Sequence, residues 1–368
     1  MRIDFIITEL FVGGAERCLT ELALRMAELG DEVRVFSIGS LPTGDRGALV
    51  KRLQASGIEV VSGNADSTRE VVSAYRQLRQ WLTESKPDIC QTFLHHANIV
   101  GTLAAKSAGV RNRVAGIRVA ESRAFRCAVE KIALKASTSV ICVSHAVERF
   151  AANRLGCPTA KLVVIANGVD TVHFSSAEPF DWSQIGWPTD AVVTLFVGRL
   201  HQQKGIELLQ SEIDKLAPSG SDQRLLLVGD GPLRSELETW ARERGPQQVQ
   251  LLGWRPDIAS LMAGSRLIVL PSHYEGMPNV ILEAMAAGKP VVCSRVEGSQ
   301  ELLKHDWDQQ SFPAGDGVQM ARLASLYLEQ QDLALKAGTR NQSFVSQNHA
   351  LVGMVNHYRS HYQKLLDR

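Results

Sequence analysis

Short apolar runs that alternate with segments of helical periodicity constrain the fold of this chain more than any other feature of its sequence. In the first 170 residues each run has the length of a strand and is followed by a turn and then by apolar residues at helical spacing. Strands that alternate with helices form parallel sheets covered on both faces, so this part predicts an α/β domain. The predicted strands are 3–8, 32–38, 87–93, 112–117, 139–144 and 161–168.

The same pattern starts again after residues 175–190, which contain two prolines and lack periodicity. A chain of 368 residues is longer than one ordinary core of about 100–200 residues, so two domains are expected. The strands of the second domain are predicted at 191–198, 224–231, 249–254, 266–272 and 290–294. We predict one domain over 1–174, a linker over 175–190, a second domain over 191–345 and an amphipathic C-terminal helix within 346–368.

Composition narrows the class of protein. Hydrophobic residues make up 45% of the chain, charged residues 21%, and the net charge is +1, which is typical of a soluble globular enzyme or binding protein and gives no sign of a nucleic-acid partner. The six cysteines lack C-x-x-C spacing, which favours reduced thiols in the cytosol. Arg2, Asp4 and Glu9 interrupt any signal-peptide core, and no run approaches the roughly 18 apolar residues of a spanning helix. We therefore expect a cytoplasmic protein.

One local segment, residues 111–135, is strongly basic. It contains seven arginines and lysines against Glu121 and Glu130, a net charge of +5. Such a field suits phosphates or an anionic membrane surface, which would place the protein at the inner face of the membrane. The alternative is a solvated helix face with paired charges.

Ligands of parallel sheets bind outside the carboxyl ends of the strands, so functional residues are expected in the loops that follow strands, facing a cleft between the two domains. In the first such loop, Gly13 and Gly14 let the backbone approach a ligand, and the following helix presents its positive end to an anion. This turn is not G-x-G-x-x-G, which argues against a nicotinamide dinucleotide. The alternative is a tight turn without a ligand.

The loop after strand 191–198 carries two cations, Arg199 and Lys204. Arginine offers a planar fork and lysine a point charge, and together they suit a diphosphate. With these cations available, we expect neither a metal ion nor another cofactor. The alternative is that both are surface cations. Asp230, in the next glycine turn, either borders the cleft or is a turn residue.

The stretch "EGMPNVILEAMAAGKPVV" holds two carboxylates eight positions apart, Glu275 and Glu283. A helix is expected from about 278 to 287, with Gly288 as its stop, so Glu275 lies in a loop and Glu283 lies among apolar residues. A buried carboxylate needs partners, and two vicinal ribose hydroxyls would supply them. The alternatives are an ion pair for Glu283 and capping of the helix by Glu275.

These motifs together resemble glycosyltransferase family 4, whose members are retaining enzymes of the GT-B fold, with two doubly wound Rossmann-like α/β domains facing a central cleft. The resemblance covers nearly the whole chain: the E-x7-E motif of Glu275 and Glu283 occurs with "FVGRLHQQKG", "VGDGP", "LLGWRPDI" and "VIANGVD" in family order. It also implies that the C-terminal helix returns to the first domain.

The resemblance implies roles for individual residues. Arg199 and Lys204 would bind the diphosphate, Glu275 the transferred sugar and Glu283 the ribose. Gly13 and Gly14 would approach the donor phosphates or the acceptor. The remaining donor-binding residues would be Trp254 and Arg255 beside the base, and Gly276, Met277, Pro278, Asn279 and Val280 within the motif.

On the acceptor side, the resemblance implies that His96 of "QTFLHHANIVG" reaches the reaction centre, with His95 as its neighbour. Related sequences often have histidines where this chain has Gln91 and Phe93. Either histidine could instead be a core residue with its hydrogen bonds satisfied. Glu121 of "GIRVAESR" is assigned to the acceptor side on the same basis.

The expected function is therefore retaining transfer of a hexose or N-acetylhexosamine from a nucleotide sugar to a glycan or polyprenyl-linked acceptor in cell-surface polysaccharide or glycolipid synthesis. A UDP-sugar is favoured, with GDP-mannose as the other donor. Two alternatives are a GT-B-like nucleotide-sugar epimerase, which would turn over the donor without an acceptor, and a non-catalytic nucleotide-sugar binding protein.

Overall fold

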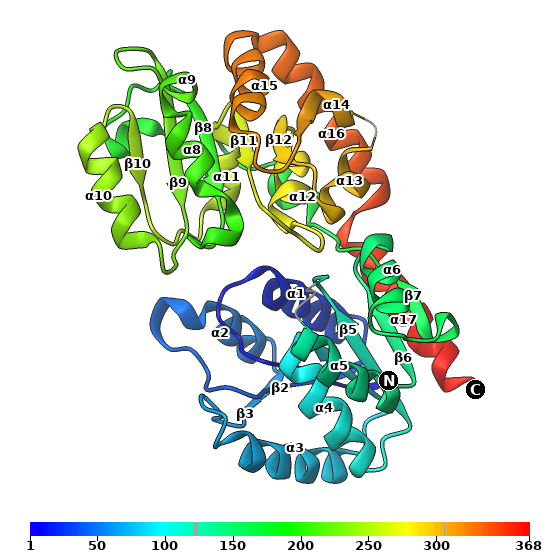
Figure 1. The fold of residues 1–368 in the computed structure, drawn as a ribbon. Helices are drawn as coiled ribbons and strands as arrows, with labels where there is room; N and C mark the ends of the chain where they lie inside the picture. The colour runs from blue at the N-terminus through cyan, green and yellow to red at the C-terminus, as the bar shows by residue number, and fades with distance from the viewer. Residues whose placement is uncertain (121–123, 305) are drawn as a thin grey trace. The chain divides into compact units, whose positions relative to one another are not determined.

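The computed structural model describes residues 1–120, 124–304 and 306–368. The chain forms two compact units (Figure 1). The first consists of Met1–Gly168 together with Leu351–Arg368, and the second is the continuous segment Val169–Ala350.

The first unit is built on a seven-stranded sheet in the order β3-β2-β1-β4-β5-β6-β7, with every paired strand parallel. The predicted doubly wound arrangement is confirmed, and β3 is a strand that the sequence pattern did not reveal. The strands are β1 (Arg2–Ile7), β2 (Glu32–Ser37), β3 (Glu59–Ser62), β4 (Ile89–Phe93), β5 (Asn112–Ile117), β6 (Ser139–Cys142) and β7 (Leu162–Val164). The helices are α1 (Gly14–Glu28), α2 (Ala48–Ala55), α3 (Val71–Ser85), α4 (His95–Ser107), α5 (Ala124–Ala136), α6 (His145–Asn153) and α17 (Leu351–Leu366).

Side chains along β1 alternate between the two faces of the sheet, and each face has its own hydrophobic core cluster. Ile3, Phe5 and Ile7 are fully buried in a cluster with α1 and α17, whereas Ile6 is buried in a second cluster with α3 and α4. Successive side chains of a strand point to opposite faces, so a sheet covered on both sides requires such continuous apolar runs. Helix α17 lies beside β6 and β7 (Figure 1), where Tyr358 and other residues complete the first cluster.

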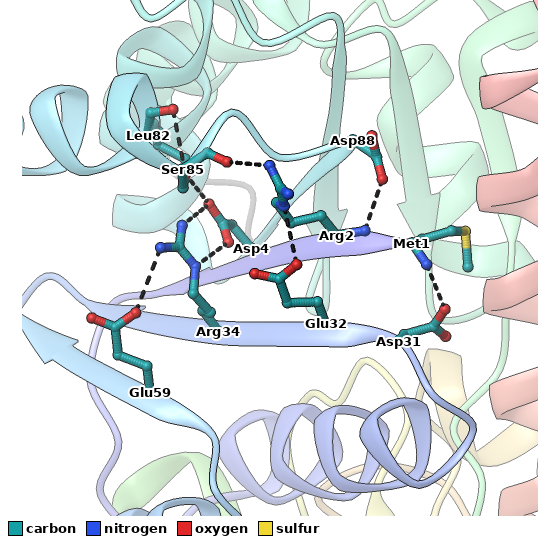
Figure 2. Close-up of polar contacts among 10 residues, drawn as sticks. All are labelled: Met1, Arg2, Asp4, Asp31, Glu32, Arg34, Glu59, Leu82, Ser85 and Asp88. Carbon is teal, nitrogen blue, oxygen red and sulfur yellow. Dashed lines mark hydrogen bonds and ion pairs between the residues drawn. The ribbon is translucent and has the colours of Figure 1, made fainter.

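An ion-pair network lies at the amino ends of β1 and β2 (Figure 2). Arg34 donates from Nε and Nη2 to the two oxygens of Asp4, at 3.0 and 2.8 Å, and Ser85 donates to the same carboxylate at 2.8 Å. Burial raises the pKa of Asp4, and the bonds from Arg34 oppose this shift. The Arg34 guanidinium also stacks on Trp81, 4.1 Å from its ring centroid. This network joins β1, β2 and α3 at the end of the sheet where the strands begin, opposite to their carboxyl ends.

The second unit is built on a six-stranded parallel sheet in the order β10-β9-β8-β11-β12-β13. Its strands are β8 (Val192–Val197), β9 (Gln223–Val228), β10 (Val249–Leu251), β11 (Leu267–Leu270), β12 (Val291–Ser294) and β13 (Ser311–Phe312). Its helices are α7 (Thr171–Ser175), α8 (Ile206–Ser211), α9 (Ile213–Leu216), α10 (Arg234–Arg244), α11 (Ile258–Gly264), α12 (Asn279–Ala286), α13 (Glu297–Leu303), α14 (Trp307–Gln310), α15 (Gly317–Glu329) and α16 (Gln331–Asn348).

The boundaries of the units differ from those expected from the sequence. Residues 175–190 are not a linker, because Phe180, Trp182 and Trp187 are buried within the second unit and the Phe180 amide donates to the Ser260 carbonyl at 3.0 Å. The N-terminal segment of the first unit ends at Gly168 rather than at residue 174, and α16 runs past the expected boundary at 345. Burial of three aromatic side chains outweighs the polar and proline residues that suggested a linker.

Candidate functional site

Of the residues predicted to bind a donor, Arg199 and Lys204 lie in the loop after β8 and Glu275 lies in the loop after β11, at the carboxyl ends of two neighbouring strands of the second sheet. Lys204 Nζ lies 2.5 Å from Glu275 Oε1, and the Ser272 hydroxyl donates to the same oxygen at 2.7 Å. Glu275 is only 8% exposed, so its charge is balanced inside the protein. The two predicted residues therefore form one ion pair in this structure.

Glycine packing holds these two loops against each other. Gly205, directly after Lys204, has φ +63°, and a Cβ atom there would lie 2.0 Å from the Pro271 carbonyl oxygen. Only glycine fits this combination of conformation and contact. The Gln203 side chain donates to the Tyr274 carbonyl at 3.0 Å, and the His273 amide donates back to the Gln203 carbonyl at 2.8 Å. The loops thus fix the Lys204–Glu275 pair through the backbone.

Arg199 is exposed at the end of the β8 strand. Its guanidinium has no ion pair or hydrogen bond with the residues that the structure describes. Next to it, Gly229 lies so close to Gly198 that a Cβ atom would be 1.8 Å from the Gly198 carbonyl oxygen. Asp230 Oδ1 accepts from the Gly231 amide at 2.9 Å, as expected of a turn residue. Arg199 is therefore a cation whose side chain is available to a ligand at the glycine-rich edge.

Glu283 lies in the middle of α12 and is 6% exposed, as predicted for a carboxylate inside an apolar helix. Helix α12 begins after Pro278, which makes no capping hydrogen bond through its side chain, and the Glu275 carboxylate is bound instead to Lys204 and Ser272. The segment before α12 is held by α13, since a Cβ atom on Gly298 would lie 2.0 Å from the Gly276 carbonyl oxygen. Gly276, Met277 and Pro278 are buried, whereas Asn279 and Val280 are partly exposed.

Trp254 and Arg255 follow β10 and differ in their surroundings. Trp254 is 37% exposed, so its ring offers an apolar face at this edge. Arg255 is bound to Asp257 through two hydrogen bonds of 2.8 and 2.5 Å, and these bonds lower the pKa of Asp257. The guanidinium also lies 5.5 Å from the ring centroid of Phe180. The Arg255 guanidinium is therefore already bound to Asp257, and Trp254 is the side chain of this loop that is available to a ligand.

At the carboxyl edge of the first sheet, Gly13 is the N-cap of α1 in extended conformation, with φ −145°. A Cβ atom there would lie 2.3 Å from Glu16 Oε2, so glycine makes room for the buried Glu16 side chain. Gly14 is the first residue of the helix. At Gly13, glycine is therefore required by the close contact with Glu16, and not by a left-handed backbone conformation.

The two histidines have different positions. His95 Nδ1 lies 3.2 Å from Glu130 Oε2 of α5, and Asn98 donates to the other Glu130 oxygen at 3.1 Å. His96 is exposed, and partial desolvation, followed by the charges of His95 and Arg126, lowers the pKa of His96. The structure therefore places His95 in a polar cluster and leaves His96 at the surface.

Leu94, the residue before these histidines, has φ +74° and ψ 159°, a conformation almost restricted to glycine. Its side chain packs against the core cluster of the first unit, which holds the residue in place. Backbone strain of this kind is concentrated at functional sites. The strain therefore marks the turn from β4 into α4, where the two histidines begin the helix.

Arg118, directly after β5, is a residue that the sequence reasoning did not select. It is 9% exposed, its Nη2 donates to Asn167 Oδ1 at 2.5 Å, and its Nη1 has no partner among the described residues. Its guanidinium lies 5.6 Å from the ring centroid of Phe93 at the end of β4. An arginine that follows an apolar strand is the same signal that selected Arg199. Glu121, predicted on the acceptor side, lies outside the described residues.

Within the described ranges, no group of three or more His, Cys, Asp or Glu side chains is arranged to hold a metal ion. The chain does contain an Asp-x-Asp pair, Asp306 and Asp308, but each carboxylate is bound to an arginine, Arg340 at 2.6 Å and Arg295 at 3.0 Å. In the same described ranges, no helix has both the length and the hydropathy that crossing a bilayer requires.

Comparison with known proteins adds to this geometry. The model of Glycosyltransferase Family 4 matches residues 12–173, and the model of Glycosyl transferases group 1 matches residues 191–330. The chain is a member of glycosyltransferase family 4. The resemblance noted from the sequence motifs is thereby confirmed, and the matched residues include the Lys204–Glu275 pair and the two histidines.

Among curated relatives, the chain is 30% identical over 256 residues to the Escherichia coli UDP-Gal:alpha-D-GlcNAc-diphosphoundecaprenol alpha-1,3-galactosyltransferase, covering 65% of each chain. It is 34% identical over 202 residues to an uncharacterized glycosyltransferase of Methanocaldococcus jannaschii, covering 53% of this chain and 51% of the relative. The chain thus spans about half to two thirds of the length of these relatives.

Among solved structures, Anabaena HepE in complex with UDP and glucose superposes with a TM-score of 0.84 at 23% identity, over 99% of this chain and 100% of that one. This similarity confirms the predicted fold class, the two Rossmann-like sheets of GT-B glycosyltransferases.

Proposed function

We propose that this protein is a retaining glycosyltransferase that transfers a hexose or N-acetylhexosamine from a nucleotide sugar. The observation that carries the proposal is the buried Lys204–Glu275 pair, which Ser272 supports at the carboxyl edge of the second sheet. Both residues lie within the matched Glycosyl transferases group 1 region. A cation and a carboxylate held this rigidly suit a ligand with a negative diphosphate joined to a hydroxyl-rich sugar.

The donor is proposed to be a UDP-sugar. The names of the E. coli relative and of the HepE complex both contain UDP, which supports this choice over GDP-mannose. Arg199 and Lys204 would bind the diphosphate, and Glu275 would accept hydrogen bonds from the transferred sugar. Glu283 would accept hydrogen bonds from the ribose hydroxyls, and the exposed Trp254 ring would border the base.

In the proposed mechanism the acceptor hydroxyl attacks from the face that the diphosphate leaves, so the anomeric configuration is retained. Negative charge grows on the departing diphosphate, and Arg199 and Lys204 stabilise it. Lys204 would exchange its contact with Glu275 for one with the diphosphate, which frees the carboxylate to orient the sugar hydroxyls. We propose that these two cations suffice without a protein-bound metal.

The acceptor is proposed to be a glycan or a polyprenyl diphosphate-linked saccharide, in line with the diphosphoundecaprenol acceptor in the name of the E. coli relative. His96 would contact the acceptor at the reaction centre. Exposed Lys131, Ile132 and Lys135 lie on one face of α5, and this face would provide peripheral contact with an anionic membrane. The proposed location is the cytoplasmic side of the membrane.

The test is a panel of nucleotide sugars, incubated with and without polyprenyl diphosphate-linked acceptors and analysed by chromatography. We expect release of UDP that depends on the acceptor, and its loss in Glu275→Gln and Lys204→Met. Matched controls are Glu238→Gln and Lys215→Met, which change exposed members of the ion pairs Arg234–Glu238 and Lys215–Glu212 in the same unit. Interconversion of donor sugars without an acceptor would contradict transfer and indicate an epimerase.

A further inference from the structure

A cavity lies at the opposite end of the sheet in the second unit from the Lys204–Glu275 pair, at the amino ends of β8, β11 and β12. Its volume is about 210 Å³. Because liquid water takes about 30 Å³ per molecule, it has room for a phosphate group and several waters. Its lining residues are Ala191, Val192, Gly264, Ser265, Arg266, Gly288, Lys289, Pro290, Gln331, Ala334 and Leu335.

The charged residues that line this cavity are both cations. Lys289 follows α12 and Arg266 precedes β11. No carboxylate among the described residues lines the cavity. Asp332, in the first turn of α16, is exposed and does not belong to the lining. The cavity is therefore a region of uncompensated positive charge.

Each cation is only partly satisfied by the protein. Lys289 Nζ donates to the Ala263 carbonyl at 2.6 Å, and Arg266 Nη1 donates to the Leu328 carbonyl at 3.3 Å. Within the described part of the chain these are the hydrogen bonds of the two side-chain head groups, although an ammonium has three N–H donors and a guanidinium five. Capping the carbonyls of α11 and α15 thus leaves most of the donors available.

Burial, followed by the charge of Arg266, lowers the pKa of Lys289 to about 8. These two causes penalise the charged form, and an anion in the cavity would oppose both by supplying an opposite charge and hydrogen-bond acceptors. The amino end of α16 also borders the cavity through Gln331, and no side chain caps this 18-residue helix. The positive end of this helix dipole also favours a negatively charged ligand.

We propose that this cavity is a second ligand site, separate from the donor site, that binds a small dianionic phosphate group through Lys289 and Arg266. The group belongs either to inorganic phosphate or to a small phosphomonoester. On binding at a pH near 8, the Lys289 amine takes up a proton, because an opposite charge beside it raises the pKa of Lys289.

The experiment is isothermal titration of the full chain with inorganic phosphate at pH 8, in two buffers of different ionisation enthalpy and at ionic strength fixed with sodium chloride. A parallel titration with glycerol 3-phosphate distinguishes free phosphate from a phosphomonoester. Lys204→Met serves as the background, since it weakens anion binding at the donor site. We expect saturable binding with proton uptake in this background.

Lys289→Met should weaken phosphate binding at least about tenfold and abolish the proton uptake. Lys336→Met is the matched control, because Lys336 is exposed on α16 and does not line the cavity, and it should leave both unchanged. A second variant, Leu335→Glu, changes a side chain that is 59% exposed at the cavity, so it should fold, and its carboxylate should also weaken phosphate binding. Absence of saturable binding, or binding that Lys289→Met and Leu335→Glu leave unchanged, would overturn the proposal.

Discussion

Removing the Lys204 ammonium should destabilise the second unit, because the buried Glu275 carboxylate would lose the cation that balances its charge. Breaking a fully buried ion pair by removing one partner costs about 3–5 kcal/mol. The Lys204 side chain is 17% exposed, the Glu275 side chain 9%, and Ser272 keeps its hydrogen bond to the carboxylate. We therefore expect Lys204→Met to lower the free energy of unfolding by about 2 kcal/mol.

The double variant separates this cost from general effects of substitution. Glu275→Gln keeps an oxygen that can accept from Ser272, so it should cost about 1 kcal/mol alone. Without the carboxylate, Lys204→Met strands no charge, so the double variant should also cost about 1 kcal/mol, giving a coupling energy of about 2 kcal/mol. A double variant that costs about 3 kcal/mol, the sum of the single variants, would refute the reasoning.

Urea unfolding followed by tryptophan fluorescence is a suitable assay. The chain has six tryptophans, and all except Trp81 belong to the second unit. The signal therefore reports mainly on the unit that contains the substitutions. Because a chain with two units need not unfold in one step, the transition must first be shown to be single for this signal.

Four further predictions concern the backbone, pH, the histidines and metal removal. Gly205→Ala should destabilise the second unit by about 2 kcal/mol or more, measured by the same unfolding assay, because of its positive φ and the contact with Pro271. Burial lowers the pKa of His361 to about 4, so its contribution of about 2 kcal/mol, reduced for solvent screening, is complete above pH 6.5 and is lost as pH falls toward 4. The hydrogen-exchange protection factors of α17, which are corrected for the pH dependence of the intrinsic exchange rate, should accordingly fall in acid less for His361→Gln than for the parent protein. His96→Ala should reduce kcat with unchanged unfolding, whereas His95→Ala should lower stability as well, since it removes a partner of α5. Treatment with EDTA followed by desalting should leave transferase activity unchanged, and restoration of lost activity by Mg²⁺ would contradict the metal-free proposal.

Much of the donor-side geometry follows from the sequence by one topological rule. Lys204 and Glu275 are 71 positions apart, yet each lies in a loop after a parallel strand, and β8 and β11 are neighbours in the sheet. Strand pattern, glycine turns and charge therefore predicted that both residues lie in loops at the carboxyl ends of strands in the second sheet. The direct ion pair was not predicted, because both residues had been assigned to different parts of a ligand.

Contacts that depend on tertiary packing could not be predicted in this way. Arg118 meets Asn167, 49 residues later, and nothing in either local pattern indicates the contact. The segment around Phe180 and Trp182 contains turn residues, so its local chemistry indicates a linker although its aromatic side chains are buried. In both places burial of individual side chains decides the structure, and a periodicity argument does not detect it.

The return of the chain to the first unit has a consequence for its synthesis. Helix α17 supplies Leu351, Met354, Val355, Tyr358, Tyr362 and Leu365 to the larger core cluster of the first unit, but these residues leave the ribosome only after the whole of the second unit. The second unit is continuous in sequence and can complete its core as soon as residue 350 has emerged. Although domains generally fold in the order of synthesis, here the unit made second is the one that can finish first.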